Sequence, residues 1–216
     1  MVRRFCWTAF DVSGLLPRDW RDDLKKAAAE ADFRDYPRTP FLSREADHVK
    51  SITRGRVPAG QVQRQLPWLY QLYRGDFTGM AEQAWREPIK PAKDNRYGIV
   101  LNVQRGNAMR FECHVDSNPL TGLLFFTEHP DGGGELVAAN DPDAVGVDAL
   151  EENGSVIRPK TGQLVFFDGK TYPHYARTLW SAGDERIVAV MNFYTESCPE
   201  ESTRPSGLNL HLFGED

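Results

Sequence analysis

Residues 110–116 read Arg-Phe-Glu-Cys-His-Val-Asp, and this stretch decides the predicted fold. Polar and apolar residues alternate along it, which is typical of a β-strand with one buried face. His114 and Asp116 are two residues apart, so on a strand both side chains point to the same side. An imidazole and a carboxylate placed in this way can bind one metal ion.

A second histidine that can join them is His174, which ends the segment Lys-Thr-Tyr-Pro-His and follows an apolar run. Two histidines and one carboxylate on one side of an ion, with the opposite positions open, are typical of non-haem Fe(II) oxygenases. The sequence therefore predicts a metal centre formed by His114, Asp116 and His174.

Composition limits the classes of protein that the chain can represent. Its 216 residues and net charge of −5 favour one domain and give no sign of a nucleic-acid-binding surface. We interpret the basic cluster of Arg54, Arg56 and Arg64 as a solvated face. Three cysteines, an odd and sparse set, indicate a reducing compartment. Without a signal peptide or a membrane-length apolar run, a cytoplasmic protein is expected.

Residues 1–95 are predicted to form a helical region that supports the rest of the chain. Apolar residues recur at helical spacing, and a proline at position 67 can begin a helix afresh. A short strand is expected over residues 3–12, and residues 34–60, rich in Pro, Arg and Gly, are expected to be a long connection. The predicted helices cover residues 18–31, 61–73 and 77–86.

Residues 96–195 change to the pattern of a β-protein, followed by a tail at 196–216. Short apolar runs alternate with turn residues, which indicates a sandwich or jelly roll and not a parallel α/β sheet. The expected fold class is mainly β with flanking N-terminal helices, in a single domain over residues 1–216. The predicted strands are 97–103, 109–116, 122–127, 135–138, 156–157, 163–167 and 186–194.

The ordered set of motifs in this region resembles the 2-oxoglutarate/Fe(II)-dependent dioxygenase superfamily, most closely its prolyl-4-hydroxylase-like branch. The set begins with His114-Val-Asp116 and Gly133-Gly-Glu-Leu136, and continues with residues 158–167, His174 and Arg186. The resemblance implies a double-stranded β-helix, a cupin-like jelly roll. It also implies Fe(II) at His114, Asp116 and His174, with 2-oxoglutarate and O₂ as co-substrates.

The resemblance further implies that Arg186 binds the far carboxylate of 2-oxoglutarate, since a planar guanidinium forms two charge-assisted hydrogen bonds. Arg177 is the alternative for this role. Members of the family often carry a tyrosine before the metal-binding strand, and here Asn102 or Gln104 takes its place as a co-substrate contact. Asn192 shares a strand face with Arg186 and is a candidate contact for co-substrate or substrate.

Two further polar residues lie on the predicted metal-binding face, Arg110 and Glu112. They are candidates to bind a zwitterionic substrate, or they pair with each other across the mouth of the barrel. A carboxylate at position 116 favours hydroxylation over halogenation, because related halogenases have a small residue there that leaves room for chloride.

The implied reaction is hydroxylation of an unactivated C–H bond, with release of succinate and CO₂. The compact chain favours a small substrate, such as a free amino acid or a related metabolite, and a monomer or homodimer without nucleic-acid or membrane partners. The alternatives are a prolyl hydroxylase acting on a peptide or protein, and a cupin-like module that binds metal without turnover. A zinc hydrolase would need Glu112 as its general base.

Overall fold

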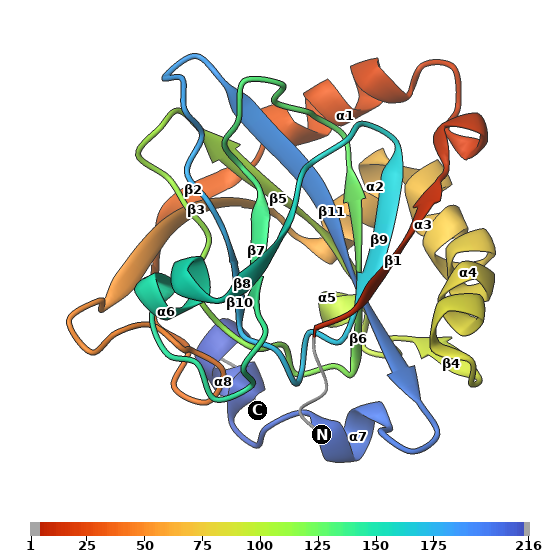
Figure 1. The fold of residues 1–216 in the computed structure, drawn as a ribbon. Helices are drawn as coiled ribbons and strands as arrows, with labels where there is room; N and C mark the ends of the chain where they lie inside the picture. Colours follow the sequence, from red (N-terminus) through yellow and green to blue (C-terminus); the bar gives the residue numbers. More distant parts are fainter. Residues whose placement is uncertain (1–4, 214–216) are drawn as a thin grey trace.

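Strand β11 (Glu185–Thr195) lies in the middle of the larger of two antiparallel sheets in the computed structural model, which describes residues 5–213 (Figure 1). The strand order of this sheet is β1-β9-β6-β11-β5-β3-β2, and β4 also pairs with β11. The smaller sheet has the order β10-β7-β8. The other strands are β1 (Trp7–Asp11), β2 (Asp32–Pro37), β3 (Ser51–Val57), β4 (Ile89–Pro91), β5 (Ile99–Arg105), β6 (Leu120–Phe125), β7 (Leu136–Ala139), β8 (Gly154–Ile157), β9 (Gln163–Phe167) and β10 (His174–Ala176).

Alternation along β11 gives the larger sheet two different faces. Ile187, Ala189 and Met191 belong to the core on the helix side of the sheet. Val188 belongs to a second core between the two sheets, and Val190 packs against it. This period of two is what a strand with a covered face on each side requires. The predicted jelly roll, a double-stranded β-helix, is confirmed.

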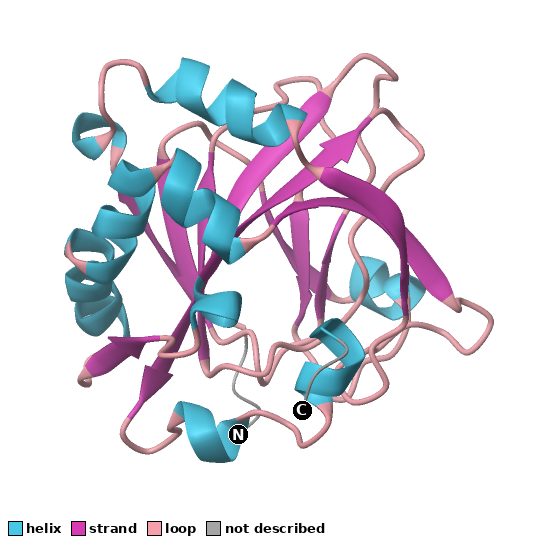
Figure 2. Cartoon of the chain, turned by 180° about the vertical axis from the view of Figure 1, so that it is seen from behind, coloured by secondary structure: helices cyan, strands magenta, loops and turns pink. Residues whose placement is uncertain are grey.

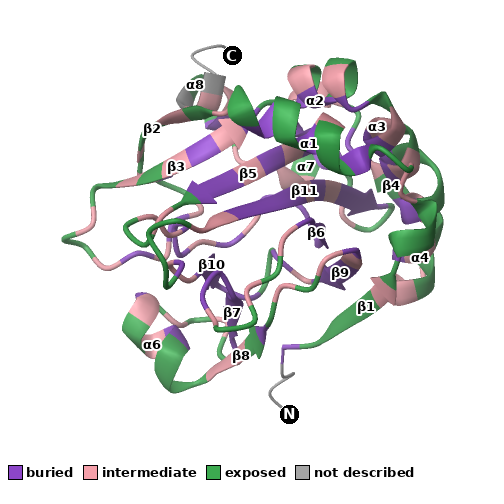
Figure 3. Cartoon of the chain, turned by 90° about the horizontal axis from the view of Figure 1, so that it is seen from above, coloured by how far each residue is buried: buried purple, intermediate pink, exposed green. Residues whose placement is uncertain are grey.

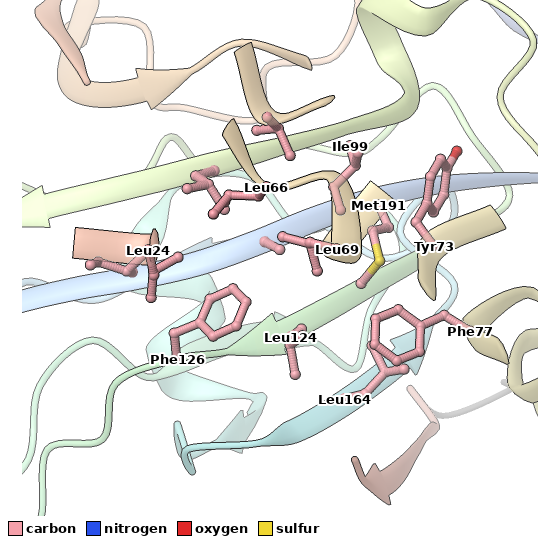
Figure 4. Packing of buried hydrophobic residues seen from close by; sticks show 14 of the residues in the cluster. Leu24, Leu66, Leu69, Tyr73, Phe77, Ile99, Leu124, Phe126, Leu164 and Met191 are labelled. Carbon is pink, nitrogen blue, oxygen red and sulfur yellow. The ribbon is translucent and has the colours of Figure 1, made fainter. Parts of the chain in front are cut away.

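Helices cover the outer face of the larger sheet, as Figure 2 shows from behind. Their apolar residues and those of the sheet form one continuous cluster, in which Tyr73, Phe77, Leu69 and Leu124 are fully buried (Figure 4). The helices of this layer are α1 (Trp20–Ala29), α2 (Ala59–Gln65), α3 (Pro67–Arg74) and α4 (Asp76–Trp85). The remaining helical elements of the described chain are the 3₁₀ turn Ser13–Leu15, α5 (Asn95–Gly98), α6 (Val147–Glu152), α7 (Glu200–Thr203) and α8 (Leu208–Phe213).

Local sequence signals account for the ends of these helices. Asp22 and Asp23 lie in the first turn of α1, where the helix dipole is positive. Pro67 begins α3. The N–H groups of a helix's first turn have no partner within the helix, so proline, which has no N–H, loses no hydrogen bond there. The predicted helix over 61–73 is therefore two helices, as the proline indicated.

The prediction for residues 34–60 is wrong. They contain most of β2 and all of β3, which pair from Asp32 with Arg56 to Pro37 with Ser51, and β3 also pairs with β5. Residues 1–95 therefore supply strands to the main sheet as well as helices. The strand predicted over residues 3–12 is present at Trp7–Asp11, and its residues 3 and 4 lie outside the described part.

Burial is concentrated in the middle of the main sheet. Figure 3 shows β5 and β11 buried along most of their length, whereas β1 and the outer surface of α1 face solvent. Among the described helices, none has the length and apolarity that crossing a bilayer requires. The division of the chain into support region, catalytic core and tail stays a prediction, as does its oligomeric state.

Candidate metal centre

Backbone hydrogen bonds hold the two candidate histidines side by side. The His114 N–H donates to the His174 carbonyl over 3.0 Å, and the His174 N–H donates to the His114 carbonyl over 2.9 Å. This antiparallel bridge brings the ring centroids to 4.5 Å. The main chain itself thereby fixes the two histidines relative to each other, although they are 60 positions apart in the sequence.

The segment around His114 is extended, but it is not the regular strand that its pattern predicts. His114 alone forms ladder-type bridges, to Ser43 and to His174. Neighbouring backbone groups bond to a loop instead: Val115 donates to Leu42, and Arg44 donates to Cys113. The metal-binding segment therefore lies between the 39–46 loop and β10.

Side chains of the segment follow the predicted alternation only in part. Phe111, Cys113 and Val115 are buried, and His114 and Asp116 face a cavity. Glu112 is also buried, at 4% exposure, and does not share the open face. This part of the prediction is wrong, because Glu112 bonds to the 39–46 loop and does not line the cavity that His114 and Asp116 face.

The predicted triad comes together. His114 Nε2 lies 3.3 Å from Asp116 Oδ1, and His174 Nε2 lies 3.6 Å from Asp116 Oδ2. Ligand atoms of all three residues lie within 4.8 Å of one another, so one ion can contact them together. Beside them is a cavity of about 50 Å³.

Hydrogen bonds of the other ring nitrogens orient both imidazoles. His114 Nδ1 lies 2.7 Å from the Glu112 carbonyl, and His174 Nδ1 lies 3.0 Å from the Tyr172 carbonyl. A carbonyl oxygen can only accept, so each Nδ1 carries a proton and donates it. In the neutral rings the Nε2 lone pairs then face the cavity, which is the arrangement that metal-ligating histidines have.

Asp116 is held by its own partners. The Thr121 hydroxyl donates to Oδ2 of Asp116, and Asn118 Nδ2 donates to the Thr121 oxygen at 2.9 Å. Gly169 accepts from the Asp116 N–H at 2.8 Å. A Cβ atom on Gly169 would lie 2.1 Å from Asp116 Oδ2, so only glycine allows the carboxylate this position.

The three groups influence one another's ionisation. Burial lowers the pKa of His174 to about 4, against the charge of Asp116. Burial opposes ionisation of Asp116, but the charge of His174 and the hydrogen bonds from His114 and Thr121 outweigh it and lower the pKa of the carboxyl. For His114, burial is outweighed by the hydrogen bond and charge of Asp116, so its pKa is raised. Asp116 is therefore anionic and His174 neutral at neutral pH.

Arg186 lines the same cavity from β11. Its side chain is 2% exposed, and its Nε donates to the Gly134 carbonyl at 2.8 Å. No carboxylate of the described chain lies within ion-pair distance of it. Burial lowers the pKa of Arg186 to about 10, with Glu135 acting in the opposite direction. The guanidinium is thus a buried cation at neutral pH without a paired anion.

The two candidate replacements for the family tyrosine have different surroundings. Asn102 lines the cavity, on β5. Gln104 is fully buried, and its Nε2 donates to the carbonyls of Met109 and Arg177, each at 3.1 Å. Gln104 is therefore engaged with the backbone, and Asn102 is the member of the pair that faces the cavity.

Other candidates are engaged elsewhere. Asn192 donates to the Tyr97 carbonyl at 2.7 Å and does not line the cavity. Arg177 forms a bidentate ion pair with Glu151, whose closer distance is 2.5 Å, so it is not available as the alternative to Arg186.

Arg110 and Glu112 do not pair with each other, contrary to one of the two expectations. Arg110 binds Glu45 through both terminal nitrogens, at 2.5 and 2.9 Å. Glu112 accepts from the Thr39 N–H at 3.2 Å. Both bind the 39–46 loop, and neither lines the triad cavity.

Sequence reasoning missed Glu45, Thr121 and Gly169, which support the triad without being part of it. Glu45 is 1% exposed and accepts from the Cys113 N–H at 2.6 Å, directly before His114. The signal for Glu45 was weak, because it lies in a segment that was expected to be a connection. A Thr five residues after Asp116 has no recognisable pattern of its own.

Comparisons with solved structures agree with this architecture. An oxidoreductase of the 2OG-Fe(II) oxygenase family from Burkholderia pseudomallei matches 87% of this chain and 85% of its own, with a TM-score of 0.56 and 14% identity. AviO1 from Streptomyces viridochromogenes Tue57 matches 94% of both chains, with a TM-score of 0.63 and 18% identity. The epimerase SnoN, in complex with Fe³⁺, alpha ketoglutarate and nogalamycin RO, matches 99% of this chain and 88% of its own, with a TM-score of 0.65 and 11% identity.

No family model and no curated protein sequence matches the chain. At the identities above, the structural similarity establishes the fold, which is that of the 2-oxoglutarate/Fe(II) oxygenases. The predicted resemblance to this superfamily is confirmed at the level of the fold, and function depends on the site.

Proposed function

We propose that this protein is an Fe(II)- and 2-oxoglutarate-dependent dioxygenase that hydroxylates an unactivated C–H bond of a small molecule, a free amino acid or a related metabolite. One observation carries the proposal: the His114, Asp116 and His174 donors converge beside a cavity into which the unpaired Arg186 also projects. The proposed metal ligands and a buried arginine without a paired anion thus line one cavity.

The donor set fits Fe(II). Two imidazoles and one carboxylate suit this ion, and three protein ligands leave positions open for other molecules. Their hydrogen bonds to Glu112, Tyr172 and Thr121 fix them before metal binds. His114, Asp116 and His174 would hold the metal.

Arg186 fits one end of 2-oxoglutarate. A buried guanidinium that lacks a carboxylate partner is costly unless an anion joins it. The far carboxylate of the co-substrate would supply that anion, while its 2-oxo acid end would face the metal. Asn102, on the neighbouring strand β5, would contribute a polar contact.

With its cofactor and co-substrates, the reaction is decarboxylation of 2-oxoglutarate by O₂ to succinate and CO₂, coupled to conversion of a substrate C–H into C–OH. The chain contributes binding, orientation and exclusion of water. Leu123, Leu136, Val188 and Val190 give the cavity apolar walls around the triad. Such walls keep solvent from a reactive centre.

Two further observations support the proposal. The solved SnoN structure, whose fold this chain shares, holds Fe³⁺ and alpha ketoglutarate. The triad cavity of about 50 Å³ and the loop bonded across residues 113–115 favour a small substrate over a long peptide.

The experiment is an anaerobic titration of the metal-free protein with Fe(II) and then 2-oxoglutarate. We expect the weak visible charge-transfer band of the iron chelate, followed by bleaching when O₂ is admitted. His174→Ala should show no band and no turnover, because it removes one of three ligands.

Absence of the band in the wild type, although metal binds, would contradict the proposal and favour a non-catalytic metal-binding module. If the band forms, succinate release is measured with free amino acids first and with prolyl peptides in parallel. Turnover of peptides alone would replace the small-molecule part of the proposal with a prolyl hydroxylase.

A further inference from the structure

The inner face of the main sheet carries further arginines beyond the triad cavity, among them Arg54 and Arg56 of β3. On β3, Arg56 pairs with Asn102 of β5, which lines that cavity. Directly opposed residues of an antiparallel pair point to the same face of a sheet. Arg56 therefore faces the inner side, and Arg54, two residues earlier, does so as well. Their interpretation as a solvated face is wrong, since both are half-buried, whereas Arg64 on α2 is exposed.

Arg54 and Arg56 have no carboxylate partner within ion-pair distance in the described chain. Their neighbours do have one: Arg34 pairs with Asp32 at 3.0 Å and Arg96 with Asp94 at 2.8 Å. Arg54 Nε is buried and has no hydrogen-bond acceptor in the described chain. Half-buried cations without partners cost free energy, which a bound anion would offset.

Electrostatics at this place favour an incoming anion. Burial lowers the pKa of Arg56, and the adjacent charge of Arg54 lowers it further. Burial also lowers the pKa of Arg54, and Glu112 only partly opposes this. The Glu112 carboxylate already accepts from the Thr39 N–H. Asp32 of β2 opposes Arg56 but pairs with Arg34, so no carboxylate of the described chain is within ion-pair distance of Arg54 or Arg56.

The pair lies between the triad cavity and a second cavity. The Arg54 guanidinium lies 4.4 Å from the ring centre of Tyr36 and 6.0 Å from that of Phe111. Phe111 lines the triad cavity. Tyr36 and Arg56 line the second cavity, of about 250 Å³. Arg54 therefore lies beside one residue of each cavity, and Arg56 lines the second cavity itself.

We propose that Arg54 and Arg56 form an anion subsite that binds a carboxylate or phosphate group of the substrate and directs the rest of the molecule toward the triad. Tyr36 forms the wall against which Arg54 is stacked. The inference rests on the proposed function for the chemistry at the triad, and it narrows the substrate class to anionic small molecules.

Binding of inorganic phosphate tests the subsite directly. The full chain, loaded anaerobically with Fe(II) and saturated with 2-oxoglutarate, is titrated with phosphate in a calorimeter. We expect saturable binding that Arg54→Gln/Arg56→Gln weakens at least about tenfold, since each lost charge-assisted contact corresponds to about that factor. Arg18→Gln, at an exposed arginine before α1, should bind phosphate as the wild type does. No saturable binding in the wild type, or equal affinity in the double variant, would overturn the inference.

A second measurement uses the wild-type chain alone, so it tests whether Arg54 and Arg56 bind an anion even if the double variant does not fold. Phenylglyoxal modifies arginines, and peptide mass spectrometry gives the rate at each position. Phosphate should slow modification of Arg54 and Arg56 and leave Arg18 unaffected. Equal rates with and without phosphate at Arg54 and Arg56 would contradict the subsite.

Matched substrate pairs identify the source of the anion. Succinate release is compared for carboxylic acids and their amides, and for phosphate esters and their alcohols. The charged member of one pair should have a kcat/KM at least about tenfold higher, and equal values in both pairs would overturn the inference. Failure of the proposed function would be visible separately: the chelate band would be absent while phosphate binding still depended on Arg54 and Arg56.

Discussion

The two imidazoles of the triad have the same hydrogen-bonding pattern but opposite pKa shifts. Each donates from Nδ1 to a backbone carbonyl two residues earlier. Burial lowers the pKa of both rings and prevails at His174, whereas at His114 the hydrogen bond and charge of Asp116 together outweigh it. Without metal, a proton at His114 is stabilised by the carboxylate that would otherwise bind the ion. Proton and metal therefore compete for the same place.

This competition predicts how metal affinity depends on pH. The pKa of His114 is raised, so as pH falls through that pKa the proton is bound and Fe(II) must displace it. His174, with a pKa of about 4, contributes no proton above that pH. Apparent Fe(II) affinity should fall by about tenfold per pH unit below the His114 pKa. Anaerobic competition with a chelator over a pH series measures it, and a pH-independent affinity would contradict the assignment.

Arg186 allows a second prediction at the level of one residue. Arg186→Gln should weaken 2-oxoglutarate binding by about 100-fold, because two charge-assisted hydrogen bonds are lost. Fe(II) affinity should not change, since the metal ligands are untouched. Titration of the chelate band with 2-oxoglutarate measures the first affinity, and anaerobic competition with a chelator measures the second. Arg177→Gln is the matched control, and if it weakens co-substrate binding while Arg186→Gln does not, Arg177 has the role instead.

At the level of elements, the 39–46 loop holds the metal-binding segment in place. Glu45 receives three hydrogen bonds, two from Arg110 and one from the Cys113 N–H. The loop backbone adds bonds to Cys113 and Val115 on either side of His114. An extended segment that lacks a regular ladder is thus kept straight by a loop that connects β2 and β3.

Glu45→Gln should loosen this anchor. Substitution leaves Arg110 without its anion at a site where Glu45 is 1% exposed, and should lower the free energy of unfolding by about 2–3 kcal/mol, less than for a fully buried pair because Arg110 is partly exposed. Fe(II) affinity should fall too, because His114 directly follows Cys113.

Chemical denaturation and metal titration measure the two effects of Glu45→Gln. The control is Asp47→Asn, in the solvent-exposed pair with Arg38, which should change neither quantity measurably. Wild-type stability in Glu45→Gln would show that the loop does not anchor the segment.

A comparison of strands β9 and β11 with the β2–β3 hairpin shows where prediction from sequence succeeded and where it did not. Strands such as β9 and β11 have strong apolar patterns, and the sequence places them correctly. The β2–β3 hairpin carries Arg34, Arg54 and Arg56; Arg54 and Arg56 are half-buried, whereas the Arg34 side chain is mostly exposed. A local sequence pattern does not show whether an arginine on a strand faces solvent or the interior, because that depends on which strand lies beside it.

The residues of the candidate site also divide into those that the sequence predicts and those that only the structure reveals. Spacing brought His114 and Asp116 together, the chemistry of a two-histidine, one-carboxylate site added His174, and family resemblance added Arg186. Glu45 and Gly169 become visible only in three dimensions, because each acts on a residue that is more than 50 positions away in the sequence. Asn192 fails for a related reason: it has the right strand face but lies where Tyr97 offers a backbone acceptor.

At the level of the whole molecule, the main sheet separates two apolar cores with different tasks. The helix-side core packs α1–α4 against the sheet and contains no residue of the triad cavity. The core between the sheets includes Leu123, Leu136 and Val188, which also form cavity walls. Stability and site geometry are thus assigned to opposite faces of the same strands.

Leu69→Ala in α3 tests this separation. Leu69 is fully buried in the helix-side core, and its truncation should lower the free energy of unfolding by about 2–5 kcal/mol through lost burial and a residual cavity. The Kd for 2-oxoglutarate, measured on the chelate band well below the melting temperature, should stay at the wild-type value. Leu15→Ala, at an exposed leucine, should change stability by less than about 0.5 kcal/mol. A weakened co-substrate affinity in folded Leu69→Ala protein would show that the helices shape the cavity through the sheet, because packed interiors transmit strain across their layers.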